Sequence, residues 1–279
     1  MYELRHEFPV TKLCKIAGIR RSTYYYGVKI MKQPDSDVEW KKEITSIFHE
    51  NKGRYGYRRV LNELLNRGYK INHKKVQRIM NELGLKCMIR MKKYKSYKGV
   101  VGKTAPNLLK RDFTATRPNE KWVTDITEFK LFGEKFYLSP VLDLFNREII
   151  TYTIGFRPTY SLVSNMLEKA LKFLPKKSTD LMIHSDQGWH YQMQRYRDAL
   201  KDRNVTQSMS RKGNCYDNAV MENFFGILKS EFIYEMEFKN KEHFLKELEK
   251  YIHYYNHKRI KTKLKGLSPV DYRTQTVVA

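Results

Sequence analysis

The chain has 279 residues and a formal net charge of +24, from 54 Lys and Arg against 30 Asp and Glu. So large a basic excess indicates a polyanionic partner, of which nucleic acid is the usual one. Hydrophobic residues make up 41% of the chain, which argues against wholesale disorder, and no apolar run is long enough for a membrane span or a signal peptide.

The three cysteines are isolated and form no CxxC pair; they are Cys14, Cys87 and Cys215. Neither a zinc site nor a disulfide framework is therefore favoured, and we expect a reducing, cytoplasmic location. The length allows two domains or one domain with appendages.

Residues 1–33 are expected to form a small helix-turn-helix segment. Within it, residues 9–26 fit two short helices, the first capped by Thr11 and ended by Gly18. A helical hairpin that only packs fits the same pattern equally well. The polar residues 27–37 have the composition of a linker.

A helical DNA-binding domain is expected over residues 38–90. Ser36 and Glu39 form a capping-box pattern ahead of a first amphipathic stretch. Two more apolar stripes follow, and Gly68 and Gly84 stand where the helices that carry them would end. Three helices are the simplest interpretation.

The last of these helices carries three basic residues on or near one face, Lys74, Lys75 and Arg78. Such a face can enter a DNA groove or clamp phosphates, or it can simply be solvated. The high net charge of the chain favours DNA contact.

A basic stretch follows this domain, since residues 86–111 contain nine Lys and Arg and no acid. We expect a flexible linker over residues 91–115 that lies along a nucleic-acid backbone, with contacts from Lys92 and Lys93. A solvated spacer without ordered contacts is the alternative.

From residue 116 to 230 the pattern changes to that of a sheet with helices. Runs of β-branched and aromatic residues predict strands at 121–129, 136–144, 148–155, 181–184 and 205–209. Helical spacing occurs between them, at 161–174 and 190–201. Gly133-Glu134 is the expected hairpin turn. A meander followed by alternating helix and strand predicts an α/β fold, with a mixed five-stranded sheet and flanking helices.

The segment from 231 to 279 is expected to be a C-terminal helical extension. A dense aromatic stripe in it indicates packing rather than stacking on bases: Tyr251, Ile252, Tyr254 and Tyr255. The basic tail after this stripe is expected to close with a turn at Pro269.

Three carboxylates carry the expected chemistry. Asp125 and Asp186 each follow a strand-like run, and Glu222 lies on a helix, with 35 residues between Asp186 and Glu222. Such acids could converge on Mg²⁺ or Mn²⁺ for phosphoryl transfer on a phosphodiester. Lys229 lies seven residues after Glu222, within about 20° of the same helix face, where it could hold a DNA backbone. Each residue alone is a weak signal.

Other polar residues near these positions have two readings. Asp143 could be a fourth site carboxylate, although a structural role is favoured. Trp189 and His190 could contact DNA or pack in a loop, and neither is preferred. Three further residues could cap the helix of Glu222 or line a DNA path: Asn214, Asp217 and Asn218.

Several segments together resemble a known family. WVTDITEF (122–129), HSDQGWHYQ (184–192) and SRKGNCYDNAVMENFFGILKSE (210–231) resemble the DDE transposases of insertion sequences. The resemblance is closest to the second-frame product of the insertion-sequence-three family, a relative of retroviral integrases. Three more segments are similar to that family, so that the resemblance covers nearly the whole chain: RYGYRR (54–59), NHKKVQRIMNELGL (72–85) and YYNHKRIKTKLKGLSPVDYR (254–273).

The resemblance implies a ribonuclease-H-like integrase catalytic core, with Asp125, Asp186 and Glu222 as catalytic metal ligands. It implies strand cleavage by water and strand transfer by a freed 3′-hydroxyl at insertion-sequence ends. Basic residues in or near its motifs are DNA-binding candidates: Arg58, Arg59 and Arg211. The His/Cys zinc module of retroviral integrases has no counterpart in this sequence, so the N-terminal helices are expected to bind DNA without metal.

The resemblance also bears on partners and location. We expect a homo-oligomer on DNA, in the nucleoid of a bacterium, and an upstream-frame product with a further helix-turn-helix as a possible partner. Two alternatives stay open: a nuclease on the same scaffold that cuts but does not join, and a DNA-binding regulator without catalysis.

Overall fold

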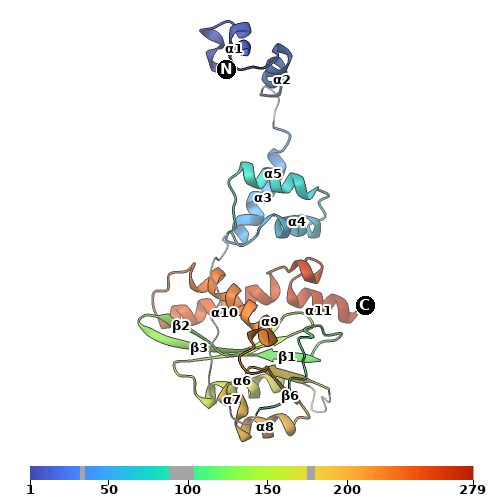
Figure 1. Ribbon diagram of the computed structural model, residues 1–279, viewed down its shortest axis with the longest axis vertical. Coiled ribbons are helices and arrows are strands. Elements are labelled where there is room, and N and C mark those ends of the chain that lie inside the picture. The colour runs from blue at the N-terminus through green and yellow to red at the C-terminus, as the bar shows by residue number, and fades with distance from the viewer. Residues whose placement is uncertain (32–34, 88–103, 175–179, 279) are drawn as a thin grey trace.

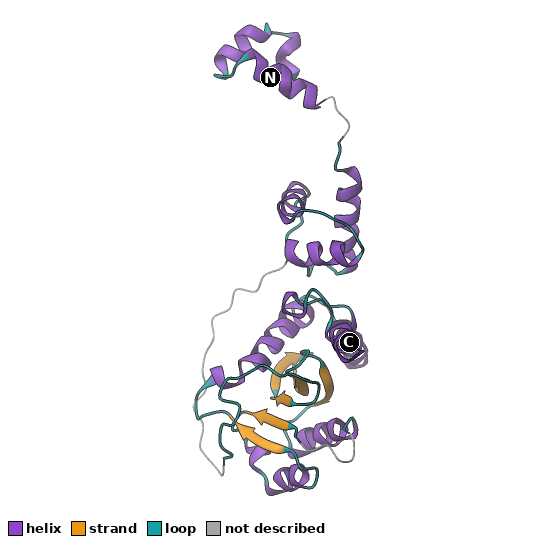
Figure 2. Ribbon diagram, turned by 90° about the vertical axis from the view of Figure 1, so that its right-hand side faces the viewer, coloured by secondary structure: helices purple, strands orange, loops and turns teal. Residues whose placement is uncertain are grey.

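The computed structural model describes residues 1–31, 35–87, 104–174 and 180–278 (Figures 1 and 2). Within these ranges no helix is both long enough and apolar enough to cross a membrane.

The N-terminal segment is a pair of short helices after a 3-10 turn, η1 (Glu3–His6): α1 (Val10–Ile16) and α2 (Arg21–Met31). Gly18, with φ of +65°, lies in the turn between them, as expected. Thr11 is not the cap, because α1 begins at Val10 and Pro9 takes the capping position. The linker expected from residue 27 begins later, because α2 continues to Met31.

Three helices form the next unit, as the sequence predicted: α3 (Val38–Glu50), α4 (Tyr57–Asn66) and α5 (His73–Glu82). Their buried apolar faces meet in one core, built mainly from Ile44, Ile47, Val60, Leu64, Val76 and Ile79. Gly68 and Gly84 follow the ends of α4 and α5 with φ of +85° and +67°, which is the left-handed geometry that favours glycine.

The capping box expected at Ser36 and Glu39 does not form. Asp37 occupies the N-cap of α3, and its side chain makes no capping hydrogen bond. Its carboxylate instead forms ion pairs with Lys75 and Arg78 of α5. The Asp37 carboxylate therefore links α3 to α5 instead of capping α3.

The sheet contains β1 (Lys121–Thr124), β2 (Thr127–Leu131), β3 (Glu134–Asp143), β4 (Ile149–Gly155), β5 (Met182–Ser185) and β6 (Thr206–Met209). β3 pairs antiparallel with β1, β2 and β4, whereas β5 pairs parallel with β1 and β6. The turn between β2 and β3 is Phe132-Gly133, both at positive φ, one residue before the expected Gly133-Glu134.

The stretch predicted as one strand over 121–129 is interrupted. Thr124 stands opposite Val141 and Thr127 opposite Leu138, so β1 and β2 meet β3 in a single register. They are two halves of one strand, separated by Asp125 and Ile126. The sheet is therefore five strands wide and mixed, and with its flanking helices it has the ribonuclease-H-like fold that was expected.

Helices cover both faces of the sheet (Figure 1). One face packs under α9 (Ala219–Leu228), its π-helical continuation η3 (Lys229–Ile233) and α10 (Lys241–His257). The other face packs on α6 (Tyr160–Lys172) and α8 (Gln194–Lys201), with α7 (Trp189–Gln192) before α8. The helix expected over 190–201 is thus split at Met193. Trp122 and Val123, neighbours on β1, point to opposite cores as strand geometry requires.

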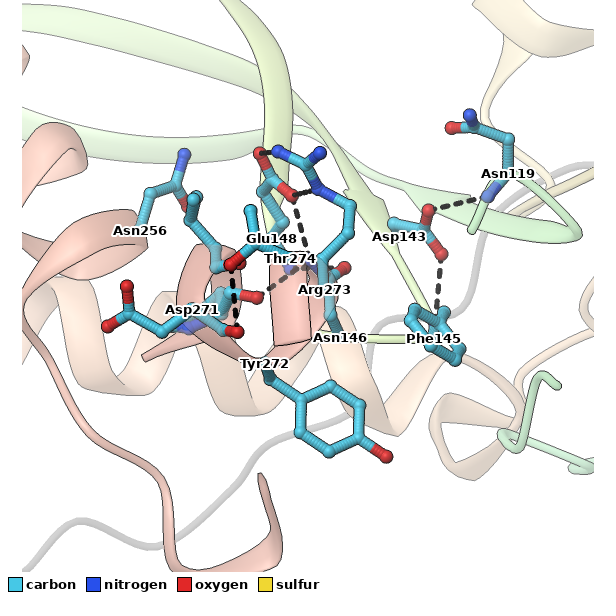
Figure 3. A network of polar contacts seen from close by, with 12 residues as sticks. Asn119, Asp143, Phe145, Asn146, Glu148, Asn256, Asp271, Tyr272, Arg273 and Thr274 are labelled. Atoms are coloured by element: carbon cyan, nitrogen blue, oxygen red, sulfur yellow. Dashed lines mark hydrogen bonds and ion pairs between the residues drawn. The ribbon is translucent and has the colours of Figure 1, made fainter. Parts of the chain in front are cut away.

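The last helix, α11 (Pro269–Val278), docks beside the turn between β3 and β4. The guanidinium of Arg273 pairs with Glu148 at 2.8 Å, and Asn146 donates to the carbonyl of Pro269 at 2.9 Å (Figure 3). The expected turn at Pro269 is instead the first residue of this helix, a position that tolerates proline because no backbone N–H is needed there.

The three-helix unit contacts the C-terminal helices through the segment after α10. The Tyr55 hydroxyl donates to the Lys258 carbonyl and accepts from the Ile260 amide, both at 3.0 Å. The Ile260 side chain is buried in the core of α3, α4 and α5. The aromatic stripe on α10 packs as expected, since Tyr251, Ile252 and Tyr255 are buried.

Candidate active site

Two of the predicted carboxylates lie side by side at one edge of the sheet. Asp125 directly follows β1 and Asp186 directly follows β5. These strands are parallel neighbours, with Trp122 opposite Ile183 and Val123 opposite His184, so the same register places Asp125 next to Asp186. Adjacent strands are about 4.8 Å apart, which brings the two side chains within direct electrostatic reach.

Backbone amides orient both carboxylates. One Asp125 oxygen accepts from the Ile126 amide at 2.7 Å, in the interruption between β1 and β2. One Asp186 oxygen accepts from the Gly188 amide at 2.8 Å. A Cβ at Gly188 would stand 2.9 Å from that oxygen, so only glycine leaves the Asp186 carboxylate where it is. The Asp-x-Gly spacing is a turn signal that sequence reasoning could have used.

Glu222 reaches the same edge from the helical layer. The side-chain amide of Asn218, just before α9, donates to the carbonyl of Thr124 at 3.3 Å. Thr124 precedes Asp125, and Glu222 lies four residues beyond Asn218, one turn along α9. This contact sets the first turn of α9 over the end of β1. We call Asp125, Asp186 and Glu222 the carboxylate edge.

Like charges and burial act together on these acids. Burial raises the pKa of Asp125 well above its usual range, and the negative charges of Asp186 and Glu222 raise it further. Burial also raises the pKa of Asp186 and of Glu222. The positive charge of Lys229 acts in the opposite direction on the Asp125 pKa, so this lysine lies near the edge, and its contact with DNA stays a prediction.

The convergence expected from the sequence is complete for two of the three acids. Over the ranges that the structure describes, no three His, Cys, Asp or Glu side chains are grouped closely enough to hold a metal ion together. Asp125 and Asp186 form a pair, while Glu222 is within Coulombic range of Asp125. The donor set consists of carboxylate oxygens, which is the chemistry that Mg²⁺ and Mn²⁺ prefer.

Buried polar groups hold β5 and β6 behind the edge. The His184 ring lies between two hydroxyls, 2.8 Å from Ser208 and 3.1 Å from Ser210. Burial lowers the pKa of His184 to about 4, so the ring is neutral at pH 7. Tyr191, which is 1% exposed, packs beside Gly188 and Asp186. Beyond the residue types, no pattern in the sequence indicated these supports.

Asp143, the possible fourth carboxylate, lies at the far end of β3 and has a structural role. Its oxygens accept from the amides of Asn119 and Phe145, both at 2.8 Å (Figure 3). Burial raises its pKa to about 6. These contacts therefore support the structural role that the sequence analysis favoured for Asp143.

Two of the DNA-binding candidates near the edge make contacts within the protein. His190 is buried, and its Nε2 lies 2.7 Å from the Pro158 carbonyl, with the exposed Trp189 stacked on it. Arg211 forms an ion pair at 2.8 Å with Asp217, which is fully buried and also binds Arg111. These contacts favour packing at His190 and leave its contact with DNA a prediction.

Asn214, Asp217 and Asn218 do not cap α9 with their side chains. Asn218 holds the N-cap position but donates to Thr124 instead. Asp217 is committed to the two arginines, which hold its pKa far below the usual range. Asn218 thus anchors the helix to the sheet instead of capping it, and the alternative, that these residues line a DNA path, stays a prediction.

The DNA-binding candidates on the three-helix unit differ in exposure and in their ion pairs. Lys75 and Arg78 pair with Asp37, and Arg78 also pairs with Glu82, so both are partly neutralised; Lys74 is exposed. Arg58 lies against the Tyr57 ring, and Arg59 is 3.8 Å from Glu231 of η3. Lys92 and Lys93 lie outside the described residues.

Family models match most of the chain. A model described as "Integrase core domain" matches residues 115–215, a second one of the same description matches 222–277, and one described as "HTH-like domain" matches 35–93.

Curated relatives match it nearly end to end. The chain is 55% identical to a putative transposase InsK of insertion sequence element IS150 from Escherichia coli K12, over 98% of this chain and 96% of that protein. It is 32% identical to the transposase InsF of insertion sequence IS3A from the same organism, over 97% and 96%. Among solved structures, the HTLV-2 integrase catalytic core domain in complex with magnesium covers 56% of this chain and 97% of its own, at 15% identity and a TM-score of 0.43.

Proposed function

Because the chain belongs to the insertion-sequence-three family of transposases, whose integrase core it carries, we propose that it cuts DNA at the ends of its insertion sequence and joins those ends to target DNA. The observation that supports this most directly is the carboxylate edge. Paired acids at the ends of two parallel strands, with a third acid one helical turn from the sheet contact, suit phosphoryl transfer rather than simple DNA binding.

Asp125, Asp186 and Glu222 are the proposed catalytic residues and would hold Mg²⁺ or Mn²⁺. Their fit rests on the oxygen donor set and on the crowding of negative charge, which raises the Asp125 pKa and calls for a positive counter-charge. When bound, the divalent cation neutralises phosphate charge and activates the attacking oxygen.

Residues of the chain itself would orient the carboxylates and bind the DNA. The Ile126 and Gly188 amides keep the two aspartates in fixed orientations, which favours a pre-organised site. Lys229 would bind a DNA phosphate beside the edge. In cleavage, water attacks the phosphorus and the bond to the 3′-oxygen breaks, leaving a 3′-hydroxyl. In joining, that hydroxyl attacks a target phosphodiester and displaces its 3′-oxygen.

The three-helix unit and the basic stretch after it would hold the DNA. We propose a division into residues 1–33, 38–90, 91–115, 116–230 and 231–279, with the middle range as a DNA-tracking linker. Candidate contacts come from Arg58, Arg59, Lys74, Lys75, Arg78, Lys92, Lys93, His190 and Arg211. The chain would act as a homo-oligomer on DNA in the bacterial cytoplasm, with an upstream-frame product as a further partner.

A strand-transfer assay with pre-cut ends tests this proposal. Duplexes that end in a free 3′-hydroxyl skip the first cut, so joined products report the second reaction alone. A transposase gives joined products with these duplexes and Mg²⁺. A nuclease on the same scaffold would cut uncut ends and join nothing, and a regulator would bind both substrates and change neither.

A further inference from the structure

A second region of concentrated charge lies beside another face of α9. A cavity of about 760 Å³ is bordered by Asn223, Phe224 and Ile227 of that helix, by the turn after β3 and by the segment after α10. Five of the residues that line it are basic: Arg59, Arg147, Arg259, Lys261 and Lys263. None of the described residues that line it is Asp or Glu. We call these five residues and the space between them the basic cavity.

Among the described residues, one carboxylate forms ion pairs with members of this group. Glu231 binds Arg259 with two hydrogen bonds, at 2.6 and 2.8 Å, and lies 3.8 Å from Arg59. Across the described residues, Arg147, Lys261 and Lys263 form no ion pair. Lys261 donates to the neutral Tyr255 hydroxyl at 2.8 Å, and the Nη1 atom of Arg147 is buried without a hydrogen-bond partner.

The neighbouring acids are engaged elsewhere. Asp143 accepts from two backbone amides and forms no ion pair, although its charge favours the protonated form of Arg147, and Glu148 pairs with Arg273 (Figure 3). The residues outside the described ranges contain no Asp or Glu, so none of their side chains can supply the missing negative charge.

Unpaired cations crowded into a protein are costly, because desolvation and mutual repulsion add. The pKa of Lys261 records this cost: burial lowers it well below its usual range, and Arg259, Arg59 and Arg147 lower it further. Lys263 is exposed, so the cavity opens to solvent at that residue. An entering anion would meet the Nη1 donor of Arg147, which has no partner although Nη2 donates to the Phe113 carbonyl, and the ammonium groups of Lys261 and Lys263, which form no ion pair with the described residues.

We propose that the basic cavity binds a phosphate group through Lys261, Arg147 and Lys263. Phosphate fits because it offers several acceptor oxygens and more than one negative charge to a group of cations. The source is either a phosphodiester of bound DNA or free inorganic phosphate. Only the DNA source rests on the proposed function.

The first test is thermal unfolding of the full chain with inorganic phosphate or chloride at equal ionic strength. Phosphate should raise the melting temperature of the wild type by several degrees more than chloride does. In Lys261→Gln that difference should vanish, although the unliganded variant should melt higher than the wild type because a repelled charge has gone. If Lys261 only supported the fold, its replacement would lower the melting temperature. A variant that melts higher without ligand and no longer responds to phosphate would therefore indicate a binding role.

Two more variants control this test. Lys263→Gln removes an exposed cation of the cavity without risk to the core, and it should weaken the phosphate response. Lys265→Gln removes another exposed cation of the same segment that does not line the cavity, and it should leave the response unchanged. A general salting-out effect of phosphate would persist equally in all three variants.

The second test identifies the source. If the ligand is a DNA phosphate, Lys261→Gln should make the slope of log K against log salt shallower by about 0.9, one phosphate contact, and Lys265→Gln should not. An unchanged slope with a retained phosphate response would assign the site to free phosphate.

Equal responses to phosphate and chloride in the wild type, or equal phosphate responses in wild type and Lys261→Gln, would overturn the inference. The thermal test needs neither DNA nor metal. A chain that responds to phosphate but joins no DNA ends would therefore remove the proposed function and leave this site in place.

Discussion

Two faces of α9 border regions of opposite charge. At the carboxylate edge Asp125 and Asp186 form a pair, with Glu222 in Coulombic range of Asp125 and Lys229 as the nearby cation. The basic cavity is lined by five cations, of which two, Arg59 and Arg259, pair with the carboxylate of Glu231. In both regions like charges raise the free energy of the fold, since each lacks its full set of counter-charges. The comparison teaches that unneutralised charge, rather than charge itself, is the feature from which we infer a ligand of the opposite sign in each region.

The largest effect is expected at the carboxylate edge. Asp125→Asn, Asp186→Asn and Glu222→Gln each keep the shape and remove one negative charge. Each should lower cleavage and strand transfer by orders of magnitude, and a double variant should be scarcely worse than a single one because the acids act as a unit. The metal-free melting temperature should not fall, because repulsion decreases.

Glu128→Gln provides the control for this prediction. Glu128 is exposed on β2 and pairs with Lys135 at 3.0 Å, a contact that includes no residue of the carboxylate edge, so its loss should leave activity unchanged. Near-wild-type cleavage by Glu222→Gln would show that the third metal ligand has been assigned to the wrong residue.

The same chemical change should have the opposite consequence for stability beside the basic cavity. Glu231→Gln leaves the buried Arg259, which is 2% exposed, without its ion partner. Breaking a buried pair of this kind costs about 3–5 kcal/mol. Urea unfolding should show that loss.

Glu168→Gln, in an exposed pair with Lys172, should change the free energy of unfolding by less than about 1 kcal/mol. If Glu231→Gln were as stable as the wild type, the cations of the cavity would not depend on that carboxylate, and the contrast between the two regions would disappear.

A smaller loss of activity is expected when the Asp186 carboxylate is displaced than when its charge is removed. In Gly188→Ala the new methyl group would stand 2.9 Å from the Asp186 oxygen and push the carboxylate aside. Activity should fall about 10- to 100-fold, the usual cost of disturbing a group that orients a metal ligand. Circular dichroism should show an unchanged fold.

Gly226→Ala is the matched control, because nothing lies within 4 Å of a Cβ at that position on α9. It should retain full activity and gain roughly 0.4–1 kcal/mol of stability from the helix. Equal activity in the two alanine variants would mean that the orientation of Asp186 is not critical.

The smallest effect is expected on the DNA affinity of α5, where Lys75 and Arg78 already pair with a carboxylate. Asp37→Asn releases Lys75 and Arg78 from their shared carboxylate. If these cations face DNA, affinity for the element ends should rise a few-fold, while Arg78→Ala should lower it. A gel-shift titration at fixed salt measures both, and two unchanged affinities would leave α5 with a structural role alone.

The sequence was a good guide where the signal is local. Strand and helix positions follow from apolar periodicity, and Asp125 and Asp186 were expected at strand ends because each closes an apolar run. The interruption at Asp125 and Ile126 was missed, because residues 121–129 have uniform β-forming character and the register across the gap is set by β3.

Pairings between distant residues could not be predicted. Lys75 and Arg78 look free in the sequence, yet their partner Asp37 lies about forty positions away, and Arg211 meets Asp217 at a turn. The basic cavity takes its residues from α4, from the turn after β3 and from the segment after α10. Counting charges gives the net value, but only the tertiary structure shows which cations remain unpaired.

The hydrogen bonds of the Tyr55 hydroxyl have a consequence during synthesis. Its acceptor, the Lys258 carbonyl, is 203 residues further along the chain. At about 5–20 residues per second, the ribosome makes that segment about 10–40 s after Tyr55. Throughout that delay the three-helix unit has an open place where Ile260 will pack. A nascent or prematurely ended chain would therefore display this apolar surface to chaperones and proteases, which could recognise the incomplete protein by it.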